Sequence, residues 1–290
     1  MKNIPRANGQ ATNPVRDILS ASMVEVVTER RVELVLSGLI PRITDVDGLD
    51  VSSKYIKYSR EMFDGKSQIT NQRPNTVPTV QITATPYEAK LLWNSNGIRV
   101  SREDRDLFAA GKTKFQNKAL STMRIMAEGE DKILKSGISE LGASGITTAE
   151  GINVFTSSAW SALSGEQILE EIRKARAAHI TGGKFKPDEL WLDDTLHALL
   201  QKPYSATEPK TILTLLEERK WFKQVVSIPE YGSATIAEVN PSCFGYVEDL
   251  PIGMTDEYQE GTDDIYMVEQ HISELIILQP KSITKLEDVM

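Results

Sequence analysis

The chain has 290 residues, of which 40% are hydrophobic, and a mean hydropathy of −0.29. These values describe a folded chain that can bury a sizeable core, as one large domain or two small ones. The sequence has no run of about 18 apolar residues, so we expect no membrane span, and its first residues lack the apolar stretch of a secretory signal. The single cysteine, Cys243, excludes an internal disulfide and a cysteine-based zinc cluster.

The net charge of −8 is distributed unevenly along the chain. Residues 51–140 carry a net charge of +5, whereas residues 141–290 carry −12. Two interpretations stay open: the charges follow no pattern on a solvated surface, or the basic middle segment meets the acidic half of an adjacent copy. The pI of about 5.1 argues against sequence-specific DNA binding, which normally uses a concentrated basic patch.

The N-terminal segment predicts a polar arm followed by a helix. Residues 1–12 are polar and contain Gly, Asn and Pro, which is typical of a flexible arm. Asn13 and Pro14 suit an N-cap and a first helical position, and apolar residues recur at helical spacing up to Val27. A second apolar run, residues 32–40, ends at Pro41, and residues 45–50 after it are predicted to form a turn.

Two long segments, 55–63 and 77–93, are predicted to pair as the antiparallel strands of a ribbon. From Val80 to Ala84 apolar residues alternate with polar ones, which indicates a strand with one covered face. Residues 64–76 between the strands are turn formers and polar groups that cannot pack a core. Because an isolated two-stranded ribbon is marginally stable, we expect it to extend onto another chain.

The most regular helical pattern covers residues 114–136 and is stopped by Gly137. Small and apolar residues recur every three or four positions on one face, and a glycine-rich loop follows. Glu128, Glu130 and Asp131 make one dense acidic patch on this helix. A shorter helix before it is predicted to be capped by Ser101.

From residue 151 onward the pattern changes to short alternating elements. Ser164 and Gln167 match a capping box that opens a helix, and Thr181–Gly183 is expected to end it. Residues 190–192 predict a buried strand. Further short helices are expected at 195–201 and 211–218, and further strands at 225–228, 235–239, 244–247 and 265–278.

The sequence predicts no catalytic, cofactor-binding or metal-binding residues. The histidines His179, His197 and His271 have no ligand-type neighbours at metal spacing. The tripeptide at 111–113 resembles the end of a phosphate loop, but Asp106 stands where that loop needs glycine. The adjacent acidic pairs are expected to be solvated turn residues, and Cys243 a small buried residue. These pairs are Asp193/Asp194, Asp256/Glu257 and Asp263/Asp264.

Several distinct motifs follow one another between residues 98 and 152. They are the run from Ile98 to Asp104, the acidic pair Glu130-Asp131 in the helix closed by Gly137, and the Gly-Ile pairs at 145–146 and 151–152. Near the end, Asp263-Asp264-Ile265-Tyr266 leads into a long apolar strand and a terminal strand at 283–286. This order resembles the major capsid proteins with the HK97 fold, which tailed bacterial and archaeal viruses share with encapsulin nanocompartments.

The resemblance implies an α+β, HK97-like capsid fold that covers most of the chain. Residues 1–34 would form an N-terminal arm and helix, and residues 53–92 an extended β-hairpin loop. The peripheral domain with the long spine helix would comprise 35–52, 93–151 and 255–290, and the axial domain 152–254. Some members crosslink the extended loop to a neighbour, and Lys66 lies at the predicted tip. No matching asparagine or catalytic carboxylate accompanies it, so crosslinking is not carried over.

The function implied by the resemblance is structural rather than enzymatic. A major capsid protein of this kind self-assembles into hexamers and pentamers of the icosahedral shell of a tailed virus and encloses double-stranded DNA without sequence-specific binding. Scaffolding, portal and decoration proteins would be further partners, with no membrane involved. The protein would be found in the virion, and in the host cytoplasm during assembly. An encapsulin-type shell around an enzyme cargo is the alternative, and a soluble α+β enzyme, for which no site is found, is a third.

Overall fold

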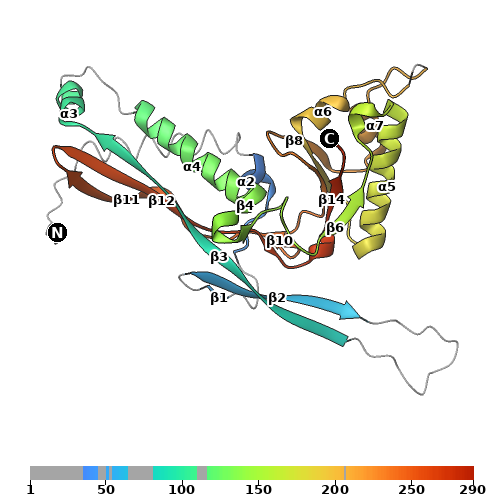
Figure 1. The fold of residues 1–290 in the computed structure, drawn as a ribbon, viewed down its shortest axis with the longest axis horizontal. Coiled ribbons are helices and arrows are strands. Elements are labelled where there is room, and N and C mark those ends of the chain that lie inside the picture. Colours follow the sequence, from blue (N-terminus) through green and yellow to red (C-terminus); the bar gives the residue numbers. More distant parts are fainter. Residues whose placement is uncertain (1–34, 45–49, 52–53, 65–80, 110–115, 206) are drawn as a thin grey trace. The chain divides into compact units, whose positions relative to one another are not determined.

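The computed structural model describes residues 35–44, 50–51, 54–64, 81–109, 116–205 and 207–290 (Figure 1). The predicted N-terminal helix, most of the turn at 45–50, the ribbon tip with Lys66 and the tripeptide at 111–113 lie outside these residues. The chain divides into two compact units. As far as they are described, the larger unit contains Val35–Leu92, Asp131–Glu248 and Ile272–Met290, and the smaller contains Trp93–Glu130 and Asp249–His271.

The described elements alternate in type along the chain. The helices are α2 (Val35–Leu39), α3 (Arg102–Ala109), α4 (Gln116–Ser136), α5 (Gly165–Gly183), α6 (Asp194–Leu199), α7 (Ile212–Arg219) and the 3-10 helices η1 (Ser139–Leu141), η2 (Trp160–Ala162) and η3 (Pro280–Ser282). The strands are β1 (Asp50–Val51), β2 (Tyr55–Asp64), β3 (Gln81–Val100), β4 (Gly137–Ile138), β5 (Ala143–Ser144), β6 (Asn153–Thr156), β7 (Glu189–Asp193), β8 (Gln224–Ile228), β9 (Ala234–Ala237), β10 (Phe244–Gly245), β11 (Glu248–Glu260), β12 (Asp263–Ser273), β13 (Ile276–Ile277) and β14 (Ile283–Glu287).

The predicted ribbon is confirmed as the antiparallel pair β2 and β3. Their register runs from Tyr55 opposite Lys90 to Asp64 opposite Gln81. Both strands belong to a five-stranded sheet with the order β1-β2-β3-β12-β11. A small apolar cluster forms the base of the ribbon in the larger unit and includes Ile56, Ala89 and Ile276.

The long helix α4 packs on the sheet of the smaller unit through one apolar face. Ala119, Met123 and Met126 of α4 meet Ile98 and Val100 of β3 and Tyr266 and Val268 of β12 in one cluster. Its predicted end is confirmed: α4 stops at Ser136, and Gly137 takes a φ of +70° that favours glycine.

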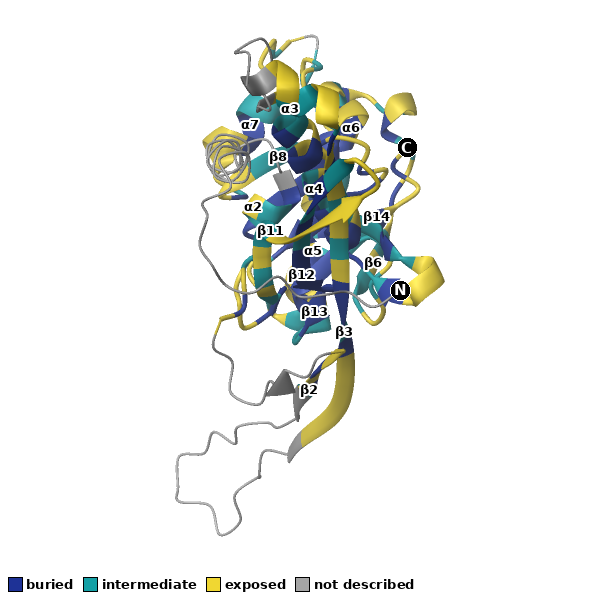
Figure 2. Ribbon diagram, turned by 90° about the vertical axis from the view of Figure 1, so that its left-hand side faces the viewer, coloured by how far each residue is buried: buried dark blue, intermediate teal, exposed yellow. Residues whose placement is uncertain are grey.

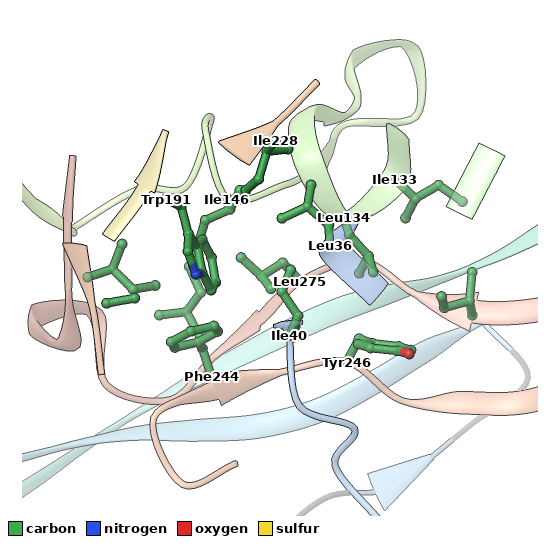
Figure 3. Packing of buried hydrophobic residues seen from close by; sticks show 14 of the residues in the cluster. Leu36, Ile40, Ile133, Leu134, Ile146, Trp191, Ile228, Phe244, Tyr246 and Leu275 are labelled. Carbon is green, nitrogen blue, oxygen red and sulfur yellow. The ribbon is translucent and has the colours of Figure 1, made fainter. Parts of the chain in front are cut away.

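A second five-stranded sheet, in the order β6-β14-β9-β7-β8, is the centre of the larger unit. β7 is buried along its whole length, as expected for a strand covered on both faces. Leu190 and Leu192 point into a cluster with α5 and α7, whereas Trp191 points into the opposite cluster with Phe244 (Figure 3). The ring centroids of Trp191 and Phe244 lie 6.1 Å apart in an edge-to-face arrangement.

Helix-start predictions in this unit are confirmed. The capping box at α5 is present in full, because the Ser164 hydroxyl accepts from Gln167 N–H and the Gln167 side chain accepts from Ser164 N–H. The predicted end of α5 is confirmed at Gly183, but Lys184 rather than a glycine takes the left-handed position, with a φ of +60°. Gly183 is needed for space rather than for the turn, because a Cβ at this position would lie 2.5 Å from the Phe185 ring and 2.7 Å from the Cβ of Lys281.

One strand prediction is wrong, and one strand was not predicted. The run 265–278 is not one strand, because β12 ends at Ser273 and β13 pairs instead with β10. β11 was not predicted at all, since its sequence contains Pro251, Gly253 and several acids that lower strand propensity. The neighbouring strand β12 provides the pairing that the local sequence does not indicate.

Candidate assembly surfaces

The ribbon of β2 and β3 presents an uncovered surface away from its base. The side chains of residues 83–88 are all exposed, so both faces of β3 are open there (Figure 2). The prediction that Ala84 lies on a covered face is therefore wrong for the single chain. A two-stranded ribbon with exposed faces gains little stability from itself, and an exposed strand edge can pair with another chain.

An arginine anchors the ribbon to the body of the larger unit. Arg60 Nε donates a hydrogen bond to the carbonyl of Ile277 at 2.8 Å. Its guanidinium carbon lies 3.9 Å from the ring centroid of Tyr87, which stacks with Tyr58 at 5.8 Å. Burial raises the pKa of the Tyr58 hydroxyl, against the opposing effect of Arg60. The sequence gives no local signal for this anchor, because Arg60 and Ile277 are far apart along the chain.

A buried polar ladder fixes α4 on the sheet of the smaller unit. Asn94 Nδ2 donates to the carbonyl of Met126 at 2.8 Å and to Gln270 Oε1 at 3.2 Å. Gln270 Nε2 in turn donates to Glu130 Oε2 at 3.0 Å. The predicted acidic patch is therefore divided: Glu130 is buried, whereas Glu128 is exposed and paired with Arg124.

Ion pairs connect α3, β3, β12 and α4 in the smaller unit. Arg99 pairs with Asp263 at 2.7 Å, and Arg105 pairs with Asp264 at 2.7 Å. The hydrogen bond from Arg99 lowers the pKa of Asp263. Because each of these carboxylates faces its own arginine, Asp263 and Asp264 hold strands and helix together and are not arranged as an acid–base pair.

The other residues considered for chemistry also have structural partners. Asp193 is the N-cap of α6 and accepts from the N–H groups of Thr195 and Gly232. Burial raises the pKa of the Cys243 thiol, which disfavours the reactive thiolate. His271 is buried beneath Trp93 and bonds Asp249 Oδ2 at 2.8 Å. Asp194 accepts from Ser227, His197 is half-buried on α6, and Asp256 and Glu257 are exposed on β11.

Neither a metal site nor a catalytic pocket emerges from the described residues. Among them, no group of three or more His, Cys, Asp and Glu side chains could hold a metal ion. A cavity of about 350 Å³ lies between the end of β3 and the first turns of α4. Lys118 in its wall already donates to the carbonyl of Arg99 and to Asp104. None of the helices in the described part of the chain is long and apolar enough to cross a membrane.

Comparison with known proteins identifies the family of this chain. A family model described as major capsid protein matches residues 65–240, which is more than half of the chain. The chain belongs to the major capsid protein family. This capsid protein is a structural component of a virion that self-assembles into a shell, and it is not an enzyme. No curated protein sequence matches it significantly.

Solved structures confirm the HK97 fold of this capsid protein. It is similar to the capsid of Myoviridae phage XM1, with a TM-score of 0.62 and 13% identity, over 87% of this chain and 90% of that chain. It is also similar to a virus-like particle from Pyrococcus furiosus, with a TM-score of 0.62 and 17% identity, over 93% and 98%. The SrpI encapsulin from Synechococcus elongatus matches with a TM-score of 0.55 and 13% identity, over 91% and 95%.

Proposed function

We propose that this major capsid protein forms the hexamers and pentamers of an icosahedral shell that encloses the double-stranded DNA of a tailed virus. The match of the major capsid protein model to residues 65–240 carries this proposal. The open ribbon of β2 and β3 supports it, since an arm without a core of its own suits a subunit that is completed by its neighbours. Assembly would take place in the host cytoplasm.

The domain roles follow from the resemblance and from strand pairing. We assign residues 1–34 to the N-terminal arm, 53–92 to the extended loop, and 35–52, 93–151 and 255–290 to the peripheral domain. Residues 152–254 are assigned to the axial domain. β14 lies within the segment 255–290 that is assigned to the peripheral domain, yet it pairs with β6 and β9 and so adds a strand to the sheet of the axial segment.

The ribbon would make the contact that links adjacent copies. Its exposed strands offer polar side chains on both faces, so a neighbour can add a strand at its edge or cover a face. The shell would then be stabilised by many repeated interfaces of ordinary size rather than by one strong contact.

The enclosed DNA would not be held by a dedicated binding site. A chain with a net charge of −8 repels phosphate on average, so retention would depend on closure of the shell. Scaffolding, portal and decoration proteins are the further partners that such a shell would engage.

The test is to purify the expressed protein and image it by cryo-electron microscopy together with an absorbance ratio for nucleic acid. We expect closed particles with fivefold and sixfold clusters of subunits. A protein that sediments as a single folded subunit under every assembly condition would overturn the proposal.

An encapsulin-type compartment is the second candidate, because the SrpI encapsulin shares the fold over 91% of this chain. The contents of particles isolated from the native source distinguish the two. Double-stranded DNA supports the viral shell, whereas a co-purifying enzyme without DNA supports the compartment.

A further inference from the structure

One acidic residue lies at the point where the ribbon leaves the sheet. Glu274 directly follows β12, and its backbone N–H donates to the carbonyl of Lys90 at 2.9 Å. The N–H of Lys90 donates back to Glu274 Oε1 at 2.8 Å. A single residue therefore satisfies both backbone groups of Lys90 on that side of β3. Toward the tip from this point, the described residues of β3 pair with β2.

The second carboxylate oxygen of Glu274 reaches the loop that follows α4. Oε2 accepts from the N–H of Ser144 at 2.5 Å, and the N–H of Leu275 donates to the carbonyl of Ser144 at 3.3 Å. Lys90 joins the same loop from the ribbon side: its Nζ donates to the carbonyls of Leu141 and Gly142 at 2.5 and 2.6 Å. Glu274 and Lys90 thus connect β3, the 139–144 loop and the end of β12, all within the larger unit.

The chemistry makes this connection specific to a carboxylate. Glu274 is only 6% exposed, and a buried carboxylate that accepts two backbone N–H groups forms charge-assisted bonds that are stronger than neutral ones. A glutamine there has one acceptor oxygen, and its NH₂ group would face an N–H donor. One half-buried backbone amide would then lose its partner, which costs more than the net value of an ordinary hydrogen bond.

We propose that Glu274 and Lys90 form a clamp that fixes the direction in which the ribbon leaves the body of the subunit, and thereby sets the geometry of contact between copies. The role of this clamp in the contact between copies rests on the proposed function of the ribbon. The clamp would couple ribbon direction to the loop that closes α4, because the same carboxylate holds both.

The experiment measures ribbon direction in dissociated subunits by distances between two spin labels. A Cys243→Ala background carries labels at Thr85→Cys on the exposed ribbon and at Ala177→Cys on the exposed side of α5. Glu274→Gln is compared with Glu140→Gln, a matched control on an exposed glutamate of the same 139–144 loop. We expect Glu274→Gln to broaden the distance distribution at least twofold, and the control to match the unsubstituted background.

Lys90→Gln is the second variant, because it keeps every backbone bond and removes only the Nζ contacts to the loop. It should broaden the distribution to a smaller extent. Distributions that match the background in both variants, even with a lowered unfolding midpoint, would reduce the clamp to a stabilising contact and overturn the proposal. If Glu274→Gln does not fold, a background-like Lys90→Gln distribution overturns it alone.

Particle diameters from the same variants separate this inference from the proposed function. We expect Glu274→Gln particles of mixed diameter where the unsubstituted protein gives one size. Failure of the unsubstituted protein to form particles would refute the proposed function, while the label distances would still decide whether the clamp exists. A single particle size in Glu274→Gln would refute its role in the contact geometry.

Discussion

At the residue scale, the C-terminal end of α4 depends on Gly137, which another residue could replace only with strain. Gly137 has a φ of +70°, and a Cβ at this position would lie 2.1 Å from the carbonyl oxygen of Ala143. We expect Gly137→Ala to lower the free energy of unfolding by more than about 2 kcal/mol, because backbone strain and a clash with backbone add together. Urea denaturation measures this.

Gly38 provides the matched control for this substitution. It lies in α2, and a Cβ there would meet no atom within 4 Å. Gly38→Ala should therefore be neutral or stabilise the protein by up to about 1 kcal/mol, as expected for alanine in a helix. Equal losses from the two substitutions would contradict the assignment of Gly137 as a conformational requirement.

The burial of His179 predicts that the protein is less stable at acid pH. It is fully buried against β14, where its Nδ1 bonds Thr284 Oγ1 at 2.8 Å, and burial lowers its pKa from 6.5 to about 4. The unfolded chain then binds the proton at higher pH than the folded chain. This contribution to stability is complete above about pH 6.5 and is lost as pH falls toward 4, by about 3 kcal/mol in total.

His179→Asn isolates this effect, because asparagine can bond Thr284 and does not titrate. As pH falls from 7 to 4, the free energy of unfolding of the native protein should decrease relative to that of His179→Asn. Urea titrations at each pH provide the measurement. Parallel pH profiles of the two proteins would show that the histidine is not held neutral by burial.

At the scale of elements, the sequence predicts what local chemistry determines and misses what distant segments determine. The capping box at Ser164 and the stop at Gly137 depend on neighbours in sequence, and both are confirmed. β11 and the break at Glu274 depend on segments far along the chain, and neither was predicted. The same holds for the assembly surface: the ribbon was predicted from alternation and turn residues, but its anchor through Arg60 was not.

That anchor leads to a prediction for the ribbon as an element. Arg60→Met removes the hydrogen bond to the Ile277 carbonyl and the contact over the Tyr87 ring. We expect a loss of about 1–2 kcal/mol in the free energy of unfolding and faster amide hydrogen exchange in β2. Arg124→Met is the control, since Arg124 pairs with Glu128 on the exposed side of α4. An exposed i,i+4 pair on a helix contributes about 0.5 kcal/mol or less, so equal effects would argue against an anchor.

At the scale of the whole molecule, the uneven charge along the chain is partly neutralised within one copy. Arg99 and Arg105 belong to the basic middle segment, yet they pair with Asp263 and Asp264 of the acidic half. These pairs use opposite charges that could otherwise attract an adjacent copy. The net charge of the whole chain, −8, then favours repulsion between subunits.

We therefore expect assembly of the capsid protein to be favoured by salt. Light scattering should rise earlier and further as ionic strength increases from about 0.02 to 0.15 M, because the screening length falls to about 8 Å. Asp256→Lys, an exposed position on β11, changes the net charge to −6 and should reduce this dependence. Assembly that weakens with salt, and weakens further in Asp256→Lys at low salt, would instead mean that the acidic half attracts a basic surface of its neighbour. An unchanged response across the series would remove charge as a determinant of assembly and leave the geometry of the ribbon contact to govern it.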